Sequence, residues 1–248
     1  LISALRKHAW KSPWAGDWTL LPCSDWGEFF THDFKPIGHI FLSKVIFLFR
    51  NGKVSCYMPR KEIDRVAYSL AKHFSDIRKI KKLTKMLRAH ADRALKFIAS
   101  NQSSKVTLSL FEEYLSVVRD YYQYHRQTRD IADGLSPAQI QKFLPFLQRA
   151  RVYAEPVFDR TLAFDRKIAS AIAKRSRLKV QHALFMTSDE IREYFKTGKV
   201  PSRKELAARS ALSVLAVISD KPYLVVGEKA ARIESLLAAS QTEGVLQG

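Results

Sequence analysis

The sequence has few of the residues and spacings from which catalytic and metal sites are built. It contains two cysteines, Cys23 and Cys56, which are too few and too far apart for a disulfide framework or a zinc site. Its seven histidines show no His-x-x-x-His spacing. The nine glycines are scattered as turn residues, and none forms a phosphate-binding loop, a nucleophile elbow or a dinucleotide fingerprint. We therefore expect no catalytic residue, no cofactor and no metal in this chain, and a helical scaffold in place of an active site.

Long apolar runs are also missing. A helix that spans a bilayer needs roughly 20 apolar residues, whereas the run at residues 45–49 is only as long as a strand. The first residue is Leu, and the residues after it lack the apolar core and cleavage site of a signal peptide. We expect a soluble piece of a longer protein with no membrane contact. The low cysteine content favours a reducing compartment, by default the cytoplasm.

Acidic residues are scarce relative to basic ones. The chain has 42 Lys and Arg against 24 Asp and Glu, a net charge of +18. Between Arg60 and Lys96, twelve basic residues face four acidic ones. These basic residues alternate with apolar ones, so the simpler interpretation is the solvated face of a helix. The alternative is a basic surface that binds the phosphates of a nucleic acid.

The first forty residues are aromatic and irregular. We expect their tryptophans to be packing anchors, because Pro and Gly residues between them interrupt any helix and any shared stacking surface. The tryptophans are Trp10, Trp14, Trp18 and Trp26, and the interrupting residues are Pro13, Gly16, Pro22 and Gly27.

A β-hairpin is predicted at residues 44–58. Apolar, β-prone residues flank Asn51 and Gly52, a pair that tolerates the positive φ angles of a type I′ turn. Pro59 should end the second strand, because it has no N–H to donate.

Helical periodicity dominates residues 61–210. Residues 61–100 form either one long amphipathic helix or two that meet near Ser75. A second helix has a candidate capping box at Ser109 and Glu112 and runs to Gly134. Ser136 and Gln139 predict the start of a third, which either bends at its two prolines or breaks at one of them. These prolines are Pro145 and Pro156.

Two groups of polar residues within this helical region invite a functional interpretation. The aromatic and basic cluster at residues 121–129 resembles a base-stacking surface, but consecutive helical residues point around the helix, which favours core and rim packing with the Tyr hydroxyls at the edge. Asp165 falls on an apolar stripe and needs a partner, which we expect to be an Arg from a neighbouring helix. A catalytic role for Asp165 lacks a second carboxylate or His in register.

Residues 185–210 predict a helix, a tight turn and a second helix. Thr187 with Glu190 forms one capping box, and Ser202 with Glu205 forms another after a proline. Gly198 is placed to end the first helix in a left-handed conformation. The order and spacing of these residues define local geometry and supply no reactive group.

The last part of the chain completes the predicted fold. Two apolar, β-prone runs on either side of residues 219–222 indicate a second strand pair, and a final helix follows. We predict a mainly α (α+β) protein with a bundle-like helical body, a hairpin near the N-terminus and a small strand pair near the C-terminus. The expected segments are residues 1–60, 61–210 and 211–248.

The phrase LFMTSDEIREYFKTGKVPSRKELAARS resembles a segment of the PEP-utilising phosphotransferases, the group of phosphoenolpyruvate synthase, pyruvate phosphate dikinase and rifampicin phosphotransferase. Thr187, Glu190, Ile191, Gly198 and Arg209 match the type of phrase found ahead of the phosphohistidine domain in that family. The order of aromatic segment, Asn-Gly hairpin, basic helix and Tyr-rich helix is similar to the stretch after the ATP-grasp domain. Residues 244–248 resemble the approach to the swivelling domain.

The resemblance implies a connector that positions a swivelling phosphohistidine domain lying outside this chain. The parent would be a transferase that moves phosphate from ATP, with magnesium, to a His and on to an acceptor. The partners would be the flanking ATP-grasp and phosphohistidine domains. None of the seven histidines stands in the family's active-site phrase, so the resemblance assigns no catalytic residue here. The alternative function remains a basic helical module that binds nucleic acid.

Overall fold

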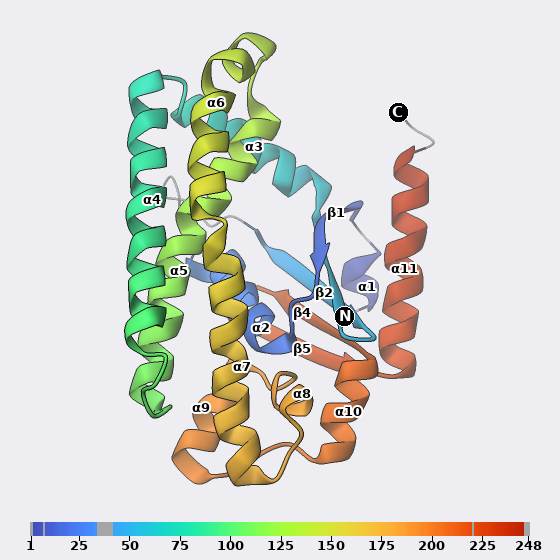
Figure 1. Cartoon of the computed structure of the whole chain (residues 1–248). Helices are drawn as coiled ribbons and strands as arrows, with labels where there is room; N and C mark the ends of the chain where they lie inside the picture. The colour runs from blue at the N-terminus through green and yellow to red at the C-terminus, as the bar shows by residue number, and fades with distance from the viewer. Residues whose placement is uncertain (1, 7, 34–41, 220, 246–248) are drawn as a thin grey trace. The chain divides into compact units, whose positions relative to one another are not determined.

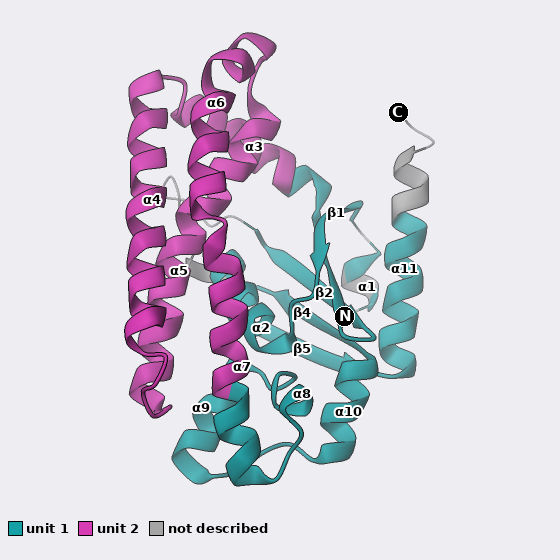
Figure 2. Ribbon diagram, viewed as in Figure 1, with its two compact units in different colours: residues 1–34, 40–62, 169–248 teal, residues 35–39, 63–168 magenta. Residues whose placement is uncertain are grey.

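A computed structural model describes residues 2–6, 8–33, 42–219 and 221–245 (Figure 1). The predicted fold class is confirmed: helices predominate, the hairpin lies near the N-terminus and the strand pair near the C-terminus. Figure 2 shows two compact units, which do not follow the three expected segments. Unit 1 comprises residues 1–34, 40–62 and 169–248, and unit 2 comprises residues 35–39 and 63–168. The helix pair at residues 185–210 thus belongs with the sheet and not with the helical body.

Unit 1 is built on one antiparallel sheet. Its five strands are β1 (Trp10–Gly16), β2 (Lys44–Arg50), β3 (Lys53–Pro59), β4 (Leu212–Ile218) and β5 (Lys221–Val226), in the order β1-β3-β2-β4-β5. The predicted type I′ turn is confirmed by φ angles of 50° at Asn51 and 79° at Gly52. β4 pairs with β2, with Val45 opposite Val217, so the two predicted strand pairs form one sheet. β2 is central, which explains why its side chains at residues 45–49 are all buried.

Short helices surround this sheet within unit 1. They are α1 (Ile2–Leu5), α2 (Leu20–Glu28), a π-helical turn η1 (Phe29–Asp33), α8 (Val180–Ala183), α9 (Ser188–Thr197) and α10 (Arg203–Ala211). The longer α11 (Glu228–Val245) buries Ile233 and Leu237 in a cluster with Ile46 and Val214 of the sheet. Arg50 forms an ion pair with Glu234, which ties β2 to α11.

The N-terminal aromatic segment is more regular than expected. Helix α2 contains both Pro22 and Gly27, so the expectation that these residues interrupt any helix is wrong. Pro22 lies in the first turn, where a backbone N–H has no helical partner to lose. A Cβ at Gly27 would lie 2.6 Å from Val217, so glycine here allows α2 to approach the sheet closely.

The tryptophans are packing anchors, as predicted. The Trp26 ring lies 5.7 Å from that of Trp14 and 4.8 Å from that of Trp18, both in edge-on arrangements. Trp10 is buried, and its indole N–H donates to the carbonyl oxygen of Leu5 at 2.9 Å. Strand β1, which carries Trp10 and Trp14, was not foreseen.

Unit 2 contains long helices. They are α3 (Arg60–His73), which enters it from unit 1, α4 (Ile77–Ser100), α5 (Leu108–Asp130) with a 3-10 turn η2 (Ile131–Gly134), α6 (Pro137–Ala154) and the first part of α7 (Pro156–Ser176). Residues 61–100 thus form two helices, because the Asp76 side chain accepts a hydrogen bond from the N–H of Arg78 and starts α4 anew. Pro145 lies inside α6, whereas Pro156 begins α7.

One predicted cap in unit 2 is confirmed and another is wrong. Ser136 and Gln139 form the complete capping box of α6. The cap of α5 is Thr107 and not Ser109: the Thr107 hydroxyl accepts from the N–H of Leu110 at 3.2 Å, and Ser109 lies within the helix. Thr107 has the extended backbone that a capping residue needs.

The buried carboxylate of Asp165 has a partner that the sequence did not reveal. The Tyr114 hydroxyl on α5 donates to Asp165 Oδ1 at 2.8 Å and also lies 3.2 Å from the carbonyl oxygen of Thr161.

Within the described ranges, no helix has both the length and the apolar character that a bilayer span requires.

We expect Gly134→Ala to destabilise the protein by about 2 kcal/mol through overpacking. A Cβ at this position would lie 2.2 Å from the backbone carbonyl oxygen of Ala67, which cannot move aside as a flexible side chain would. Urea unfolding measures the change. Gly52→Ala is the control, because a Cβ there meets nothing within 4 Å and its cost is that of the left-handed backbone, about 1 kcal/mol. An equal or smaller loss for Gly134→Ala would contradict this packing.

Candidate functional site

The residues that carry the family resemblance form one local structure in unit 1. Thr187 caps α9: its hydroxyl accepts from the N–H of Glu190 at 3.2 Å, while the Glu190 carboxylate accepts from the N–H of Thr187 at 2.9 Å. Gly198 ends α9 with a φ of 75°, and its N–H donates to the carbonyl oxygen of Tyr194. Ile191 is fully buried. The predicted capping box and the glycine stop are both confirmed.

The second predicted box is only half formed. The Ser202 hydroxyl accepts from the N–H of Glu205 at 3.1 Å and starts α10, as expected. The Glu205 carboxylate, however, accepts from Arg209 at 2.5 Å on the next turn of the helix. A charged partner competes successfully for the carboxylate, because a hydrogen bond between two charged groups is stronger than one to a backbone N–H.

Arg209 links the two helices. Its guanidinium is almost completely buried and donates to both carboxylate oxygens of Glu190, at 2.7 Å each. It also donates to the carbonyl oxygen of Phe185 at 3.2 Å. Burial opposes the charge of Arg209, but the hydrogen bonds and charges of Glu190 and Glu205 outweigh it and raise its pKa. Because Glu190 serves both the cap of α9 and the ion pair, one carboxylate fixes α9 relative to α10.

The helix pair is attached to the rest of unit 1 at both ends. At its start, the Ser24 hydroxyl of α2 accepts from the N–H of Ser188 at 2.8 Å. At its end, the backbone N–H of Asn51 in the hairpin turn donates to the carbonyl oxygen of Ala211 at 3.0 Å. We call residues 187–211 the locked helix pair, since caps, ion pairs and these two attachments determine its position.

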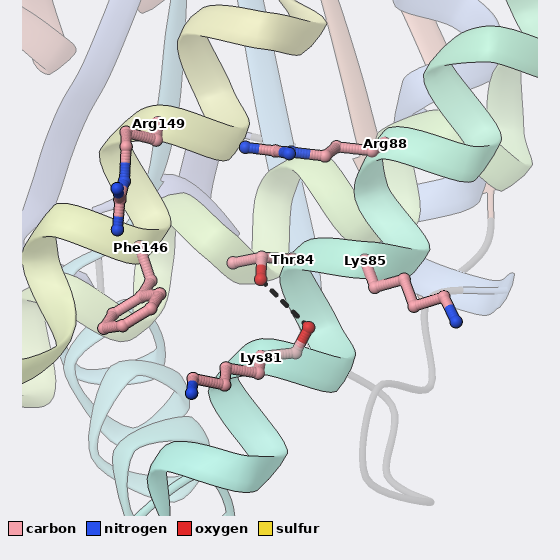
Figure 3. A pocket seen from close by; sticks show the side chains of 6 residues that line it. All are labelled: Lys81, Thr84, Lys85, Arg88, Phe146 and Arg149. Atoms are coloured by element: carbon pink, nitrogen blue, oxygen red, sulfur yellow. Dashed lines mark hydrogen bonds between the residues drawn. The ribbon is translucent and has the colours of Figure 1, made fainter.

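A second candidate site lies in unit 2, between α4 and α6. A pocket of about 370 Å³ there has a strongly basic lining, and Figure 3 shows the side chains that line it. Lys81 and Arg88 extend from α4 towards α6, whereas Lys85 points away from Phe146 (Figure 3). The lining residues are Lys81, Thr84, Lys85, Arg88, Phe146 and Arg149. We call this pocket the α4–α6 basic groove.

Aromatic rings contact three of the four cations of the groove. The ammonium of Lys81 lies 5.5 Å and the guanidinium of Arg149 lies 5.1 Å from the centroid of the Phe146 ring. The Arg88 guanidinium lies 5.2 Å from the ring of Tyr153. Such cation–π contacts restrict side chains that would otherwise move freely in solvent.

Three of the four cations of the groove come from the basic region that the sequence favoured as a solvated helix face. Lys81, Lys85 and Arg88 belong to the basic region between Arg60 and Lys96, and all three are exposed, as a solvated face requires. Phe146 and Arg149 come from α6 and were not foreseen. No pattern in the sequence near Phe146 or Arg149 marks them as groove residues, because they line the groove only when α6 packs beside α4.

The aromatic cluster of α5 is part of a core. Tyr121 is fully buried, and its hydroxyl donates to the carbonyl oxygen of Ala154 at 3.1 Å. The expected position of the Tyr hydroxyls at the edge is therefore wrong for Tyr121, although the packing role is confirmed. The His125 ring lies 4.9 Å from the ring of Phe158. Burial, and then the charges of Arg151 and Arg129, lower the pKa of His125 to about 3.

Among the side chains that the structure describes, no group of three or more His, Cys, Asp and Glu residues is arranged to hold a metal ion. Comparison of the chain with protein-family models, with curated proteins and with solved structures gave no match.

We expect Glu190→Gln to lower the free energy of unfolding by about 3 kcal/mol, because it leaves a buried Arg209 without its bidentate partner. Glutamine retains the oxygen that caps α9, so the loss reports mainly on the ion pair. Urea unfolding checks this value. Glu205→Gln is the matched variant, and because the Glu205 side chain is 48% exposed it should cost below about 1 kcal/mol. Equal losses for the two variants would show that Glu190 has no special position.

We also expect stability to fall as the pH drops from about 6.5 towards 3. The unfolded chain takes up a proton at His125 in this window and the folded chain does not, so the slope is up to about 1.4 kcal/mol per pH unit. His125→Phe should reduce this slope, because it removes the group that takes up the proton. Urea unfolding at a series of pH values measures the slopes. Identical slopes for wild type and His125→Phe would refute the assignment.

Proposed function

We propose that this chain is the connecting body of a PEP-utilising phosphotransferase and that it positions a swivelling phosphohistidine domain. The observation that supports this proposal most strongly is the locked helix pair. Five residues match the family phrase, and each has a defined part in that one structure: Thr187 as cap, Glu190 as cap and ion-pair partner, Ile191 in the core, Gly198 as helix stop and Arg209 as the buried cation. The resemblance rests on residues that have no catalytic chemistry, and each of them has a structural part in the locked helix pair.

A connector of this kind needs parts of fixed geometry. A swivelling domain that carries phosphate between distant sites reaches them only if its point of attachment is held in place. In the locked helix pair, two capped helices share a buried ion pair and are attached to both α2 and the hairpin turn. Bending this structure would break several hydrogen bonds at once.

The chemistry in this proposal belongs to domains outside residues 1–248. An ATP-grasp domain would bind ATP and magnesium, and a phosphohistidine domain would receive the phosphoryl group and pass it to an acceptor. This division of labour agrees with a chain whose recognisable motifs are caps and turns. Cys23 and Cys56 are both buried, which suits the reducing cytoplasm that we propose as its location.

Phosphoryl labelling of the intact polypeptide encoded by the gene tests the proposal. Incubation with magnesium and ATP labelled in its β and γ phosphates should produce one acid-labile, base-stable phosphoryl group. Peptide mapping by mass spectrometry at alkaline pH should place it on a histidine outside residues 1–248. A label within these residues, or the absence of any label on histidine, would refute the connector role. The coding sequence on both sides provides an independent check, because unrelated flanking domains would also refute it.

A further inference from the structure

We propose that the α4–α6 basic groove binds a run of adjacent phosphate groups. This inference goes beyond the connecting role, which lies in unit 1 and requires no charged surface. It rests on a pocket of about 370 Å³ whose lining contains four basic side chains and no acidic one. The basic side chains are Lys81, Lys85, Arg88 and Arg149.

The cations of the groove differ from their basic neighbours in their partners. On the same helix, Arg78 pairs with Asp76 at 2.7 Å and Arg93 pairs with Asp120 at 3.2 Å. Among the described residues, no ion pair connects any of the four groove cations to a carboxylate. Their positive charges are therefore available to an anion from solution.

The acidic side chain one helical turn beyond Arg88 on α4 is already engaged. Asp92 accepts a hydrogen bond from the hydroxyl of Tyr153 at 2.7 Å. The ring of the same Tyr153 lies beneath the guanidinium of Arg88. Tyr153 thus contacts both residues: its hydroxyl donates a hydrogen bond to the Asp92 carboxylate, and its ring orients the Arg88 guanidinium.

The spacing of the cations favours several phosphates over one. Lys81 and Arg88 are seven residues apart on α4, which corresponds to two helical turns and about 10 Å along one face. Arg149 faces them from α6, where its Nε–H donates to the carbonyl oxygen of Pro145 at 3.1 Å and so fixes the start of the side chain. The side chains of Lys81 and Arg88 thus start about 10 Å apart, a span that two or three adjacent phosphates match better than a single phosphate does.

The groove also holds like charges close together against an apolar wall. The Lys81 and Arg149 cations converge on the ring of Phe146 (Figure 3). Repulsion between them is relieved when an anion enters, which adds to the affinity for a multivalent ligand. Consecutive phosphates occur in a nucleic-acid strand and in free oligophosphates, and the groove recognises the chemistry that these two share.

Fluorescence anisotropy of the whole chain tests this inference with two probes. The first is a fluorescein-labelled single-stranded RNA of about twelve nucleotides, titrated at several salt concentrations. The second is inorganic tripolyphosphate, added both as a competitor of the RNA and alone in a calorimetric titration. For the variant Lys81→Ala/Arg88→Ala/Arg149→Ala we expect the dissociation constant to rise about tenfold or more. The slope of log affinity against log salt concentration should become shallower by about 0.7 for each phosphate that the variant no longer neutralises.

The control variant removes the same charge elsewhere. Arg160→Ala/Arg175→Ala/Lys199→Ala deletes three exposed cations that lie outside the groove and should leave binding within about twofold of wild type. Circular dichroism verifies that both variants are folded, as expected because alanine is the best helix former and the groove residues lie on helices.

Each outcome decides for or against the groove. Competition by tripolyphosphate supports recognition of phosphates as such, binding of RNA alone supports a nucleic-acid strand, and binding of tripolyphosphate alone supports a small oligophosphate. The absence of binding by both probes at low salt would overturn the inference. Equal loss in the groove variant and the control variant would also overturn it, because it would show that binding depends on net charge alone.

Discussion

The ion pair between Arg209 and Glu190 is the interaction on which the best-defined part of unit 1 depends. A buried guanidinium is costly unless its hydrogen bonds are satisfied. Here a bidentate carboxylate, Glu205 and a backbone carbonyl accept from its two terminal nitrogens, while its buried Nε has no hydrogen-bond partner among the described residues. Glu190 can accept from Arg209 only while α9 begins at Thr187, since the cap determines where its carboxylate points. The cap of α9, the packing of α9 against α10 and the burial of the Arg209 charge therefore depend on one another.

Features encoded within four or five residues could be predicted from the sequence. The Asn51-Gly52 turn, the Ser136 box and the Gly198 stop each require only local backbone conformations and nearby hydrogen bonds. Two local predictions were wrong, or only half right, because two residues or two partners compete over a short distance. Thr107 and Ser109 both offer a hydroxyl, and the backbone conformation decides between them; Glu205 can complete a box or bind a cation, and the charged partner prevails.

Long-range features could not be predicted in this way. The pairing of β2 with β4 joins residues 44–50 to residues 212–218, and nothing in either strand alone specifies the other. β1 contains a proline and a register shift near Trp14, which obscure the alternation typical of a strand. The same limit applies to both candidate sites. Arg209 was visible as a member of a phrase but not as the partner of Glu190, and Arg149 gains its meaning only from the α4 cations across the groove.

The two candidate sites make different demands on the sequence. Positioning by the locked helix pair needs a few residues in fixed geometry, and the charge of its buried Arg209 is balanced by carboxylates of the same two helices. The positioning role does not account for the net charge of +18. The α4–α6 basic groove is a place in unit 2 where positive charge without an ion-pair partner and concavity coincide among the described residues. Because the two sites share no residue and belong to different compact units, substitutions in one can be used to measure its contribution while the other is intact.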